Sequence, residues 1–311
     1  MSDPPRIAVF GAGGVGAYFG GRLAQAGADV HLIARGDHLA ALEAEGLAVE
    51  SIHGDFHVDL PATDDPADIG PCDYVLFCVK STDTEPATAQ IDPLVGEDTA
   101  VVSLQNGVDN EEKLADAVGK DHTMGGVAYI FSTIGDPGII QHTSGPARMV
   151  FGELDGSVTP RAERLRDWCE AADLAVTLSD DVWREIWDKY AFICAHNGLT
   201  AAVRLPIGEI RETEATIDLY RRLIEEVGAV AAAEGVDLPD DLVANVLDFV
   251  ADADPDTTSS LHYDLTHDKP MELEALNGEL VRRGREHDVP VPMNEAIYGI
   301  LKPWQLRNAR D

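Results

Sequence analysis

The chain has 311 residues, which is enough for two ordinary domains with hydrophobic cores of their own. Hydrophobic residues make up 45% of it, and no stretch reaches the roughly 20 uncharged apolar residues of a membrane span, so we expect a soluble protein. Its 56 acidic residues against 23 lysines and arginines give a formal net charge of −33, and such a surface repels the phosphates of nucleic acids.

The acidic residues are spread along the whole sequence. A solvated surface is one explanation, but we favour halophilic adaptation to a salt-rich cytoplasm, in which salt screens the repulsion. The four cysteines stand singly in apolar surroundings, so the sequence indicates a reducing compartment and neither a disulfide framework nor a metal site. The first residues lack the basic start of a signal peptide, and we predict a cytoplasmic protein.

The chain opens with an apolar strand at residues 6–10, which leads into the glycine-rich sequence Gly11-Ala12-Gly13-Gly14-Val15-Gly16. A helix pattern and a second strand at 29–33 follow. A helix that begins at such a turn presents free N–H groups and its positive end to a pyrophosphate. Glycines also simply build turns, but the strand, helix and strand around this motif favour a dinucleotide site at residues 11–16.

Two continuous apolar runs, at 73–79 and 99–104, are typical of parallel strands that are covered on both faces. The first run ends at Lys80 and the second at Asn106, in the sequence Gln-Asn-Gly. Ligands of doubly wound sheets bind beyond the carboxyl ends of the strands. We therefore expect Lys80 and Asn106 to lie near the cofactor or the substrate.

Other β-prone and helical patterns complete an α/β half of the chain. They are a hairpin or an irregular strand pair beside the main sheet at 46–60, a helix at 111–118, antiparallel strands at 122–153, a helix at 160–171 and a strand at 175–178. Beyond residue 180 only helical patterns occur, at 182–202, 209–234, 240–251 and 270–287 and after Pro292. This break predicts a Rossmann-type dinucleotide-binding domain at 1–180 and an all-helical substrate and catalytic domain at 181–311, with the active site in a cleft between them.

The end of the second strand indicates which dinucleotide binds. An NAD site usually has an acidic residue about 20 positions after the first glycine, where it binds the ribose 2′-hydroxyl. This chain has no carboxylate there and carries Arg35 instead. An arginine suits a 2′-phosphate, so NADPH is the predicted cofactor, although an arginine in a loop is also ordinary on any surface.

The helix that opens the second half carries Lys189, with Asn197 close in helical phase. A lysine held in a cleft can donate a proton to a carbonyl oxygen while hydride arrives at the carbon, and burial would lower its pKa toward a useful range. A solvated charge is the ordinary role of a lysine. Further on stand Ser260 and Glu272, and from spacing alone Glu272 is best explained as a structural residue of a first helical turn.

Together, the glycine motif, Lys80, the Gln-Asn106-Gly sequence, the Trp-x-Lys189 helix and Ser260 followed by Glu272 and Asn-Gly resemble the ketopantoate reductase family. The likeness runs in the same order over nearly the whole chain. The resemblance implies NADPH-dependent reduction of 2-dehydropantoate (ketopantoate) to pantoate, on the route to pantothenate and coenzyme A. By matching position the resemblance implies that Lys189 is the general acid, that Glu272 holds the substrate hydroxyl or orients the lysine, and that Ser260 binds the substrate carboxylate. It also implies that Asn106 lies against the nicotinamide ribose and the substrate, that Asn197 contacts the substrate, and that Lys80 lies near the cofactor.

One departure from the family pattern puts the substrate in doubt. The family helix commonly has an asparagine one turn after the lysine, and this chain has Ile193, which cannot form a side-chain hydrogen bond. A related reductase of another branched 2-oxo acid is therefore an alternative. A cofactor-sensing protein without catalysis is another, although Lys189 and Glu272 argue against it. The sequence does not determine the oligomeric state, and it is compatible with a homodimer.

Overall fold

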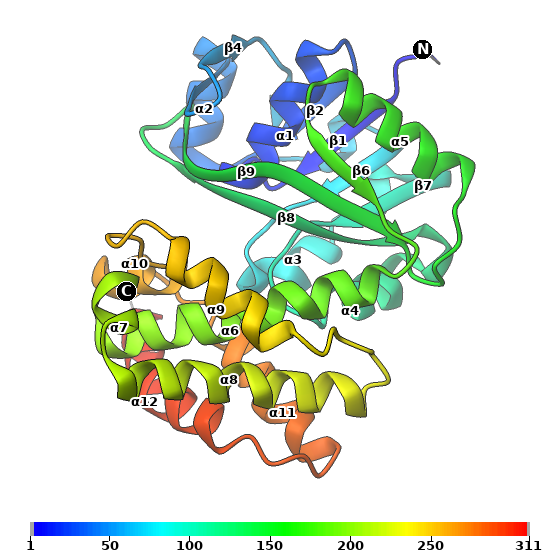
Figure 1. The fold of residues 1–311 in the computed structure, drawn as a ribbon. Helices are drawn as coiled ribbons and strands as arrows, with labels where there is room; N and C mark the ends of the chain where they lie inside the picture. Colours follow the sequence, from blue (N-terminus) through cyan, green and yellow to red (C-terminus); the bar gives the residue numbers. More distant parts are fainter. Residues whose placement is uncertain (1–2, 310–311) are drawn as a thin grey trace. The chain divides into compact units, whose positions relative to one another are not determined.

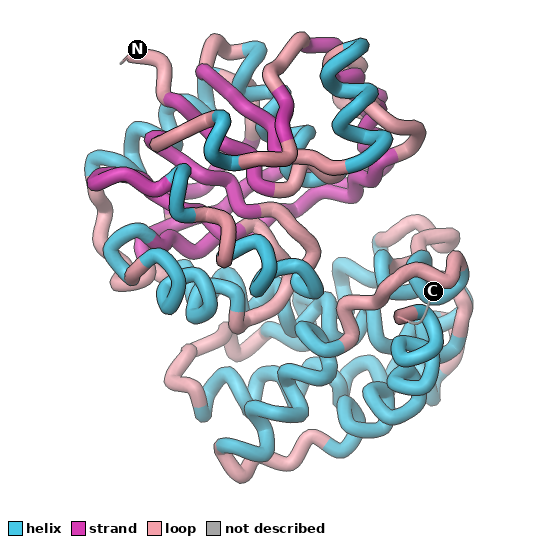
Figure 2. The backbone as a smooth tube through the Cα atoms, turned by 180° about the vertical axis from the view of Figure 1, so that it is seen from behind, coloured by secondary structure: helices cyan, strands magenta, loops and turns pink. Residues whose placement is uncertain are grey.

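The computed structural model describes residues 3–309, which form two compact units. One unit comprises the chain up to Gln105 together with Asn110–Glu185, and the other comprises Asn106–Asp109 together with the residues from Ile186 onwards. In the described residues all strands belong to the first unit, as Figure 2 shows, so the predicted fold class is confirmed. The domain boundary that the sequence predicts between residues 180 and 181 remains a prediction.

The first unit combines a sheet with short and long helices, labelled in Figure 1. Its strands are β1 (Arg6–Phe10), β2 (Asp29–Ile33), β3 (Leu47–Ser51), β4 (Phe56–Val58), β5 (Ala62–Thr63), β6 (Cys72–Phe77), β7 (Val95–Ser103), β8 (Thr123–Ile134), β9 (Ile139–Glu153) and β10 (Ala175–Leu178). Its α-helices are α1 (Gly14–Gln25), α2 (Gly36–Glu45), α3 (Thr84–Thr88), α4 (Asn110–Val118) and α5 (Pro160–Ala171). Short 3-10 turns lie at Pro66–Asp68, Ser81–Asp83, Asp92–Leu94 and Lys120–His122.

Within residues 3–309 the strands form one ten-stranded sheet, in the order β4-β3-β9-β8-β7-β6-β1-β2-β5, with β10 beside β9. The strand β1 is central and pairs in parallel with both β2 and β6. The predicted hairpin of β3 and β4 and the predicted antiparallel pair β8 and β9 are confirmed. The carboxyl ends of β1, β2 and β6 therefore lie at one edge of the sheet, where ligands of such folds bind.

The sheet is covered on both faces, which explains its continuous apolar strands. Along β1, Ile7 and Val9 pack into a core with α1 and α5, while Ala8 and Phe10 pack into a second core with α3 and α4. Successive side chains of a strand point to opposite faces, so a strand between two helical layers must be apolar throughout. Figure 1 shows α1 and α5 on one side of this sheet and α3 and α4 on the other.

Among the described residues of the second unit, helices are the only regular secondary structure. Its α-helices are α6 (Val182–Val203), α7 (Ile207–Arg211), α8 (Glu214–Ala233), α9 (Leu242–Asp252), α10 (Ser260–Thr266), α11 (Glu279–Glu286) and α12 (Pro292–Asn308), with a π-helical turn at Glu274–Gly278. From Ile193 to Ala201 every residue of α6 is buried. A helix buried on all sides is the centre of its bundle, and α6 has that place here.

Two helical predictions were wrong in their extent. The helix predicted at 209–234 is two helices, α7 and α8, because Thr213 between them has an extended backbone and its hydroxyl donates to the carbonyl of Glu209. The helix predicted at 270–287 contains the π-helical turn, in which Leu276 has non-helical φ and ψ of −101° and −110°. The short helix α10 was not predicted. Within residues 3–309, no helix is both long enough and apolar enough to cross a bilayer.

Candidate functional site

The glycine motif forms the turn between β1 and α1. Gly11 has a φ of +97°, a conformation that costs glycine least, and a Cβ at Gly16 would lie 2.4 Å from the carbonyl oxygen of Gly11. The hydrogen bonds of α1 begin where the Ala17 N–H donates to the Gly13 carbonyl at 2.9 Å. The helix itself therefore does not use the amides of residues 14–16, which are the groups that hold a pyrophosphate in a Rossmann fold.

Unlike Gly11, Gly14 and Gly16, Gly13 has open space where a Cβ would lie. A Cβ on Gly14 would lie 2.1 Å from the carbonyl oxygen of Ser132, so the fold excludes a side chain there. A Cβ on Gly13 would meet no atom of the described chain within 4 Å, and its φ of −79° suits any residue. The fold thus tolerates a side chain at Gly13, which is the second glycine of the motif, the one that lets the backbone approach the pyrophosphate in a Rossmann fold. The residues present fit a dinucleotide.

We expect Gly13→Ala to fold normally and to bind NADPH at least about tenfold more weakly, because its methyl group occupies the approach of the pyrophosphate. Fluorescence titration of NADPH measures the affinity and thermal unfolding measures the stability. Gly299→Ala is the matched control, since a Cβ there also meets no described atom within 4 Å. Equal NADPH affinity in both variants would contradict a pyrophosphate at this turn.

Arg35 and Lys80 follow the two strands that flank β1. Arg35 is exposed and directly precedes α2, after the end of β2. Lys80 is also exposed and precedes a 3-10 turn, after the end of β6. Because β1, β2 and β6 are parallel neighbours, both cations stand beyond the same edge of the sheet as the glycine turn. Both residues therefore lie where the sequence predicts, beyond the carboxyl ends of their strands. Their contacts with a cofactor remain predictions.

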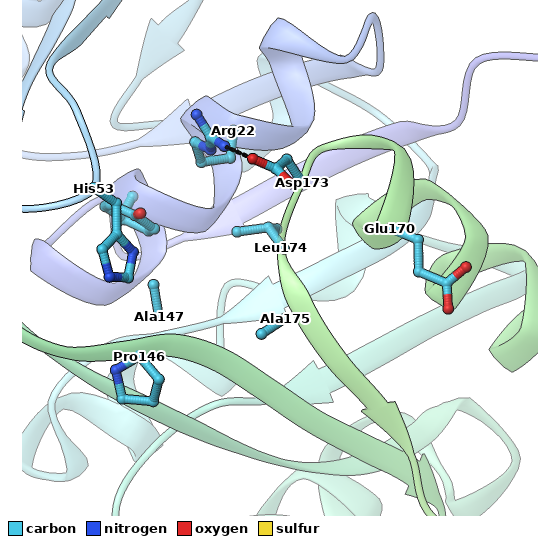
Figure 3. Close-up of a pocket in the computed structure, with 9 residues that line it drawn as sticks. Arg22, His53, Pro146, Ala147, Glu170, Asp173, Leu174 and Ala175 are labelled. Carbon is cyan, nitrogen blue, oxygen red and sulfur yellow. Dashed lines mark hydrogen bonds and ion pairs between the residues drawn. The ribbon is translucent and has the colours of Figure 1, made fainter.

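A pocket of about 480 Å³ lies elsewhere in this unit, against the later part of α1 (Figure 3). It is lined by Tyr18, Arg22, His53, Pro146, Ala147, Glu170, Asp173, Leu174 and Ala175. None of the residues predicted to bind a cofactor or substrate lines it. Its cation, Arg22, pairs with Asp173 at 3.4 Å, and Glu170 adds a further negative charge. The pocket therefore carries no features of the predicted chemistry.

In the helical unit, Lys189 and Asn106 are brought together although they are 83 positions apart in the sequence. The Lys189 Nζ lies 2.7 Å from the Asn106 Oδ1 and donates to it, since an ammonium group can only donate. Burial lowers the pKa of Lys189 to about 8, and the negative charge of Glu272 acts against this shift. A lysine with such a pKa is protonated in a large fraction of molecules near neutral pH and gives up its proton readily.

Glu272 is half-buried and stands just before the π-helical turn. This turn is fastened to α6 at two points. The Tyr190 hydroxyl donates to the carbonyl of Leu276 at 2.7 Å, and the Asn277 Nδ2 donates to the carbonyl of Cys194 at 3.2 Å. The hydrogen bonds hold the segment after Glu272 on the helix that carries Lys189. The turn, which sequence periodicity missed, thus sets where Glu272 stands relative to Lys189.

Asn197 and Ser260 also meet, with the Asn197 Nδ2 at 3.3 Å from the Ser260 Oγ. Asn197 is buried on α6, while Ser260 is exposed at the first residue of α10. The neighbouring Ser259 has a structural role, because its hydroxyl accepts from the N–H of His262 and so caps α10. The capping serine is the sequence signal that could have revealed α10.

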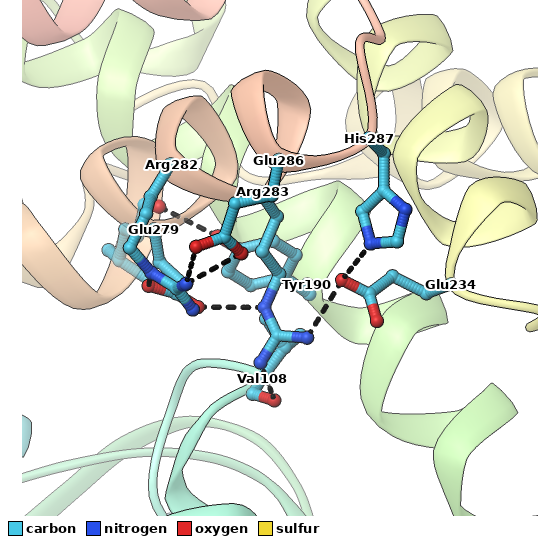
Figure 4. Close-up of polar contacts among 9 residues, drawn as sticks. Val108, Tyr190, Glu234, Glu279, Arg282, Arg283, Glu286 and His287 are labelled. Carbon is cyan, nitrogen blue, oxygen red and sulfur yellow. Dashed lines mark hydrogen bonds and ion pairs between the residues drawn. The ribbon is translucent and has the colours of Figure 1, made fainter.

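A buried charge cluster, which sequence reasoning missed, holds the loop of Asn106 (Figure 4). Arg283 is 4% exposed, and its guanidinium donates to Glu279 at 2.7 Å and pairs with Glu234 at 2.9 Å. It also donates to the carbonyl of Val108 at 3.3 Å. Val108 lies two residues after Asn106. Arg283 and Lys189 therefore both hold this loop against the helices of its own unit.

The chain matches two family models, "Ketopantoate reductase PanE/ApbA" over residues 7–156 and "Ketopantoate reductase PanE/ApbA C terminal" over residues 181–305. It is 31% identical to a 2-dehydropantoate 2-reductase of Caulobacter vibrioides, over 96% of this chain and 99% of that protein.

Solved structures give the same result. A PanE/ApbA family ketopantoate reductase from Ralstonia eutropha superposes with a TM-score of 0.90 at 36% identity, covering 98% of this chain and 99% of the other. A D-mandelate dehydrogenase solved with NADH and anilino(oxo)acetate reaches the same TM-score at 21% identity, over 98% of this chain and 99% of that one, and shares the fold alone. The chain therefore belongs to the ketopantoate reductase family and is a dinucleotide-dependent oxidoreductase.

Proposed function

We propose that this enzyme reduces 2-dehydropantoate to pantoate with NADPH, as a step toward pantothenate and coenzyme A. The observation that carries the proposal is the contact of Lys189 with Asn106, at 2.7 Å, on a lysine whose pKa burial lowers to about 8. When bound, NADPH supplies the hydride that adds to the carbonyl carbon of the 2-oxo acid. Lys189 gives the proton from its Nζ to the carbonyl oxygen, and water then returns a proton to the lysine.

The other residues of the helical unit bind and orient in this proposal. Asn106 accepts from the Lys189 Nζ and so directs the ammonium group. The charge of Glu272 favours the protonated lysine, and its carboxylate can accept a hydrogen bond from a substrate hydroxyl. Asn197 and Ser260, which already lie 3.3 Å apart, supply an amide and a hydroxyl for the substrate carboxylate.

We propose NADPH rather than NADH because Arg35 stands where an NAD enzyme carries an acidic residue. Arg35→Asp should lower the ratio of kcat/KM with NADPH to that with NADH by about tenfold or more, because a carboxylate repels a 2′-phosphate and accepts from a 2′-hydroxyl. Steady-state kinetics with both cofactors measures this ratio. An unchanged ratio would exclude Arg35 as the residue that binds the 2′-phosphate.

A second candidate is the reduction of another branched 2-oxo acid. The observation in its favour is Ile193, which is 6% exposed and lies one turn after Lys189 on α6. An isoleucine offers no hydrogen bond to a substrate hydroxyl, so a 2-oxo acid with a less polar side chain would lose nothing at this position.

The decisive experiment is NADPH oxidation by the purified enzyme with 2-dehydropantoate and with a panel of branched 2-oxo acids. High potassium chloride belongs in the assay, since we propose that the net charge of −33 reflects a salt-rich cytoplasm. The proposal requires the highest kcat/KM for 2-dehydropantoate. A higher value for another 2-oxo acid establishes the second candidate, and NADPH binding without any turnover favours a cofactor sensor. Light scattering in the same buffer tests whether the enzyme is a homodimer.

A further inference from the structure

His38 connects the glycine turn with two other segments of the first unit. It lies on α2, three residues after Arg35, and is half-buried. Its Nε2 is 2.8 Å from the carbonyl oxygen of Ala12, and its Nδ1 is 3.0 Å from the backbone nitrogen of Gly138. Both contacts are within ordinary hydrogen-bond distance.

The two contacts define the protonation state of the ring. The Gly138 N–H can only donate, so the Nδ1 must accept and carries no proton. The carbonyl of Ala12 can only accept, so the Nε2 must carry the proton and donate. The link therefore needs the neutral imidazole with its proton on Nε2. A protonated ring would turn a second N–H toward that of Gly138 and break this contact.

The linked segments belong to the part of the first unit that we propose binds the cofactor. Ala12 belongs to the turn 11–16, and α2 begins directly after Arg35. Gly138 belongs to the loop between β8 and β9, and Ser132 of β8 closes off the space at Gly14. One imidazole thus ties the turn of the pyrophosphate site to the helix behind Arg35 and to the hairpin that packs against the turn.

We propose that His38 is a positioning residue for the dinucleotide, and that its neutral form is the form competent to bind. By holding the Ala12 carbonyl, the ring fixes the peptide planes of the turn, whose amides face the pyrophosphate. This inference rests on the dinucleotide binding proposed above and not on the identity of the 2-oxo acid.

Charged groups around the ring are few and exposed. The turn 11–16 has no titratable side chain, Arg35 directly precedes α2, Asp37 lies beside His38 on α2, and the β8–β9 loop carries Asp136. All three side chains belong to exposed residues, where water screens them. Burial lowers the pKa of His38 below its ordinary value of 6.5, and the hydrogen bond to Ala12 acts in the opposite direction. The neutral form therefore dominates at neutral pH and is lost as the pH falls.

Two variants separate the link from the volume of the ring. Glutamine has an amide N–H that can donate to Ala12 and a carbonyl that can accept from Gly138, and it does not titrate. Leucine offers neither group. His57→Leu is the matched control, because the exposed His57 also lies against a backbone carbonyl, that of Glu45 at 2.7 Å, but at the far end of α2.

The experiment is fluorescence titration of NADPH from about pH 5 to about pH 8, the range in which histidines titrate, with thermal unfolding of each variant. We expect His38→Leu to raise the Kd about tenfold or more at pH 8, and His57→Leu to leave it unchanged. The wild type should bind more weakly as the pH falls. His38→Gln should restore the affinity at pH 8 and remove the added weakening in acid.

Three outcomes would overturn the inference. They are wild-type affinity in a folded His38→Leu, failure of a folded His38→Gln to restore binding, and an acid weakening that persists in His38→Gln. If the leucine variant does not fold, the pH profile of the glutamine variant still decides. If the wild type binds no dinucleotide, the proposed function and this inference both fail. If it binds NADPH but reduces no 2-oxo acid, only the proposed function fails.

Discussion

Lys189→Ala should lower kcat by about a hundredfold to ten-thousandfold, the usual contribution of a general acid, while NADPH still binds. The reason is that the carbonyl oxygen of the substrate gains negative charge as hydride arrives, and the ammonium group of Lys189 is the proton source in our proposal. The glycine turn, which we propose holds the pyrophosphate, belongs to the other unit, so the variant leaves it intact. Steady-state kinetics and NADPH titration measure the two effects.

The pH dependence of the wild type follows from the same lysine. Lys189 can act as an acid only when protonated, and the protonated fraction falls as the pH rises through a pKa of about 8. We therefore expect kcat/KM to decline above about pH 8 and to keep its value just below it. In Lys189→Ala this decline on the alkaline side should disappear, since the group that causes it is absent.

Lys120→Ala is the control for Lys189→Ala. It removes the same charge from an exposed position of the first unit and should leave kcat and its pH profile unchanged. An alanine variant at 189 with wild-type kcat would rule out this lysine as the proton donor. A loss of kcat that keeps the alkaline decline would assign that decline to a different group.

Most of the fold could be predicted from the sequence, because its elements repeat simple patterns. Apolar runs of strand length marked β6 and β7, and the glycine motif marked the start of α1 within the described structure. The errors arose where tertiary contacts override the local pattern. Tyr190 and Asn277 join the π-helical turn to α6 by hydrogen bonds, and no periodicity within 270–287 reports such contacts.

The candidate site was predictable in its residue types but not in its contacts. The spacing between Lys189 and Asn106 carries no signal that they touch, since they are 83 positions apart in the sequence. His38 and Arg283 had no motif at all, because their partners are mostly backbone carbonyls, amides or carboxylates from distant elements. A sequence motif reports groups that act together along one element, whereas these two residues act across several.

Arg283→Met should lower the free energy of unfolding by about 3 to 5 kcal/mol, because it leaves the buried carboxylate of Glu279 without its second guanidinium. Glu279 is 6% exposed and also pairs with Arg282. Burial favours its neutral acid, but the guanidinium groups of Arg282 and Arg283 outweigh this effect and lower the pKa of Glu279. Urea unfolding monitored by circular dichroism measures the loss.

The lowered pKa also fixes the pH range of this contribution. A carboxylate whose pKa is lower in the folded state stabilises the fold above its ordinary pKa, 4.5 for glutamate, and this stability is lost as the pH falls through the lowered value. Wild type should therefore lose stability in acid, and Arg283→Met should lose less over the same range. Glu279→Leu combined with Arg283→Met should recover part of the loss seen at neutral pH, because the buried carboxylate that keeps only Arg282 in the single variant is then absent.

Arg285→Met is the matched control. Arg285 pairs with Glu295 on the surface of the same unit, with side chains 72% and 43% exposed, and such a pair contributes no more than about 1 kcal/mol. Equal losses in the two single variants would show that burial of the cluster has no energetic consequence. Because Arg283 also holds the carbonyl of Val108, its variant should in addition raise the KM for the 2-oxo acid through a loosened Asn106.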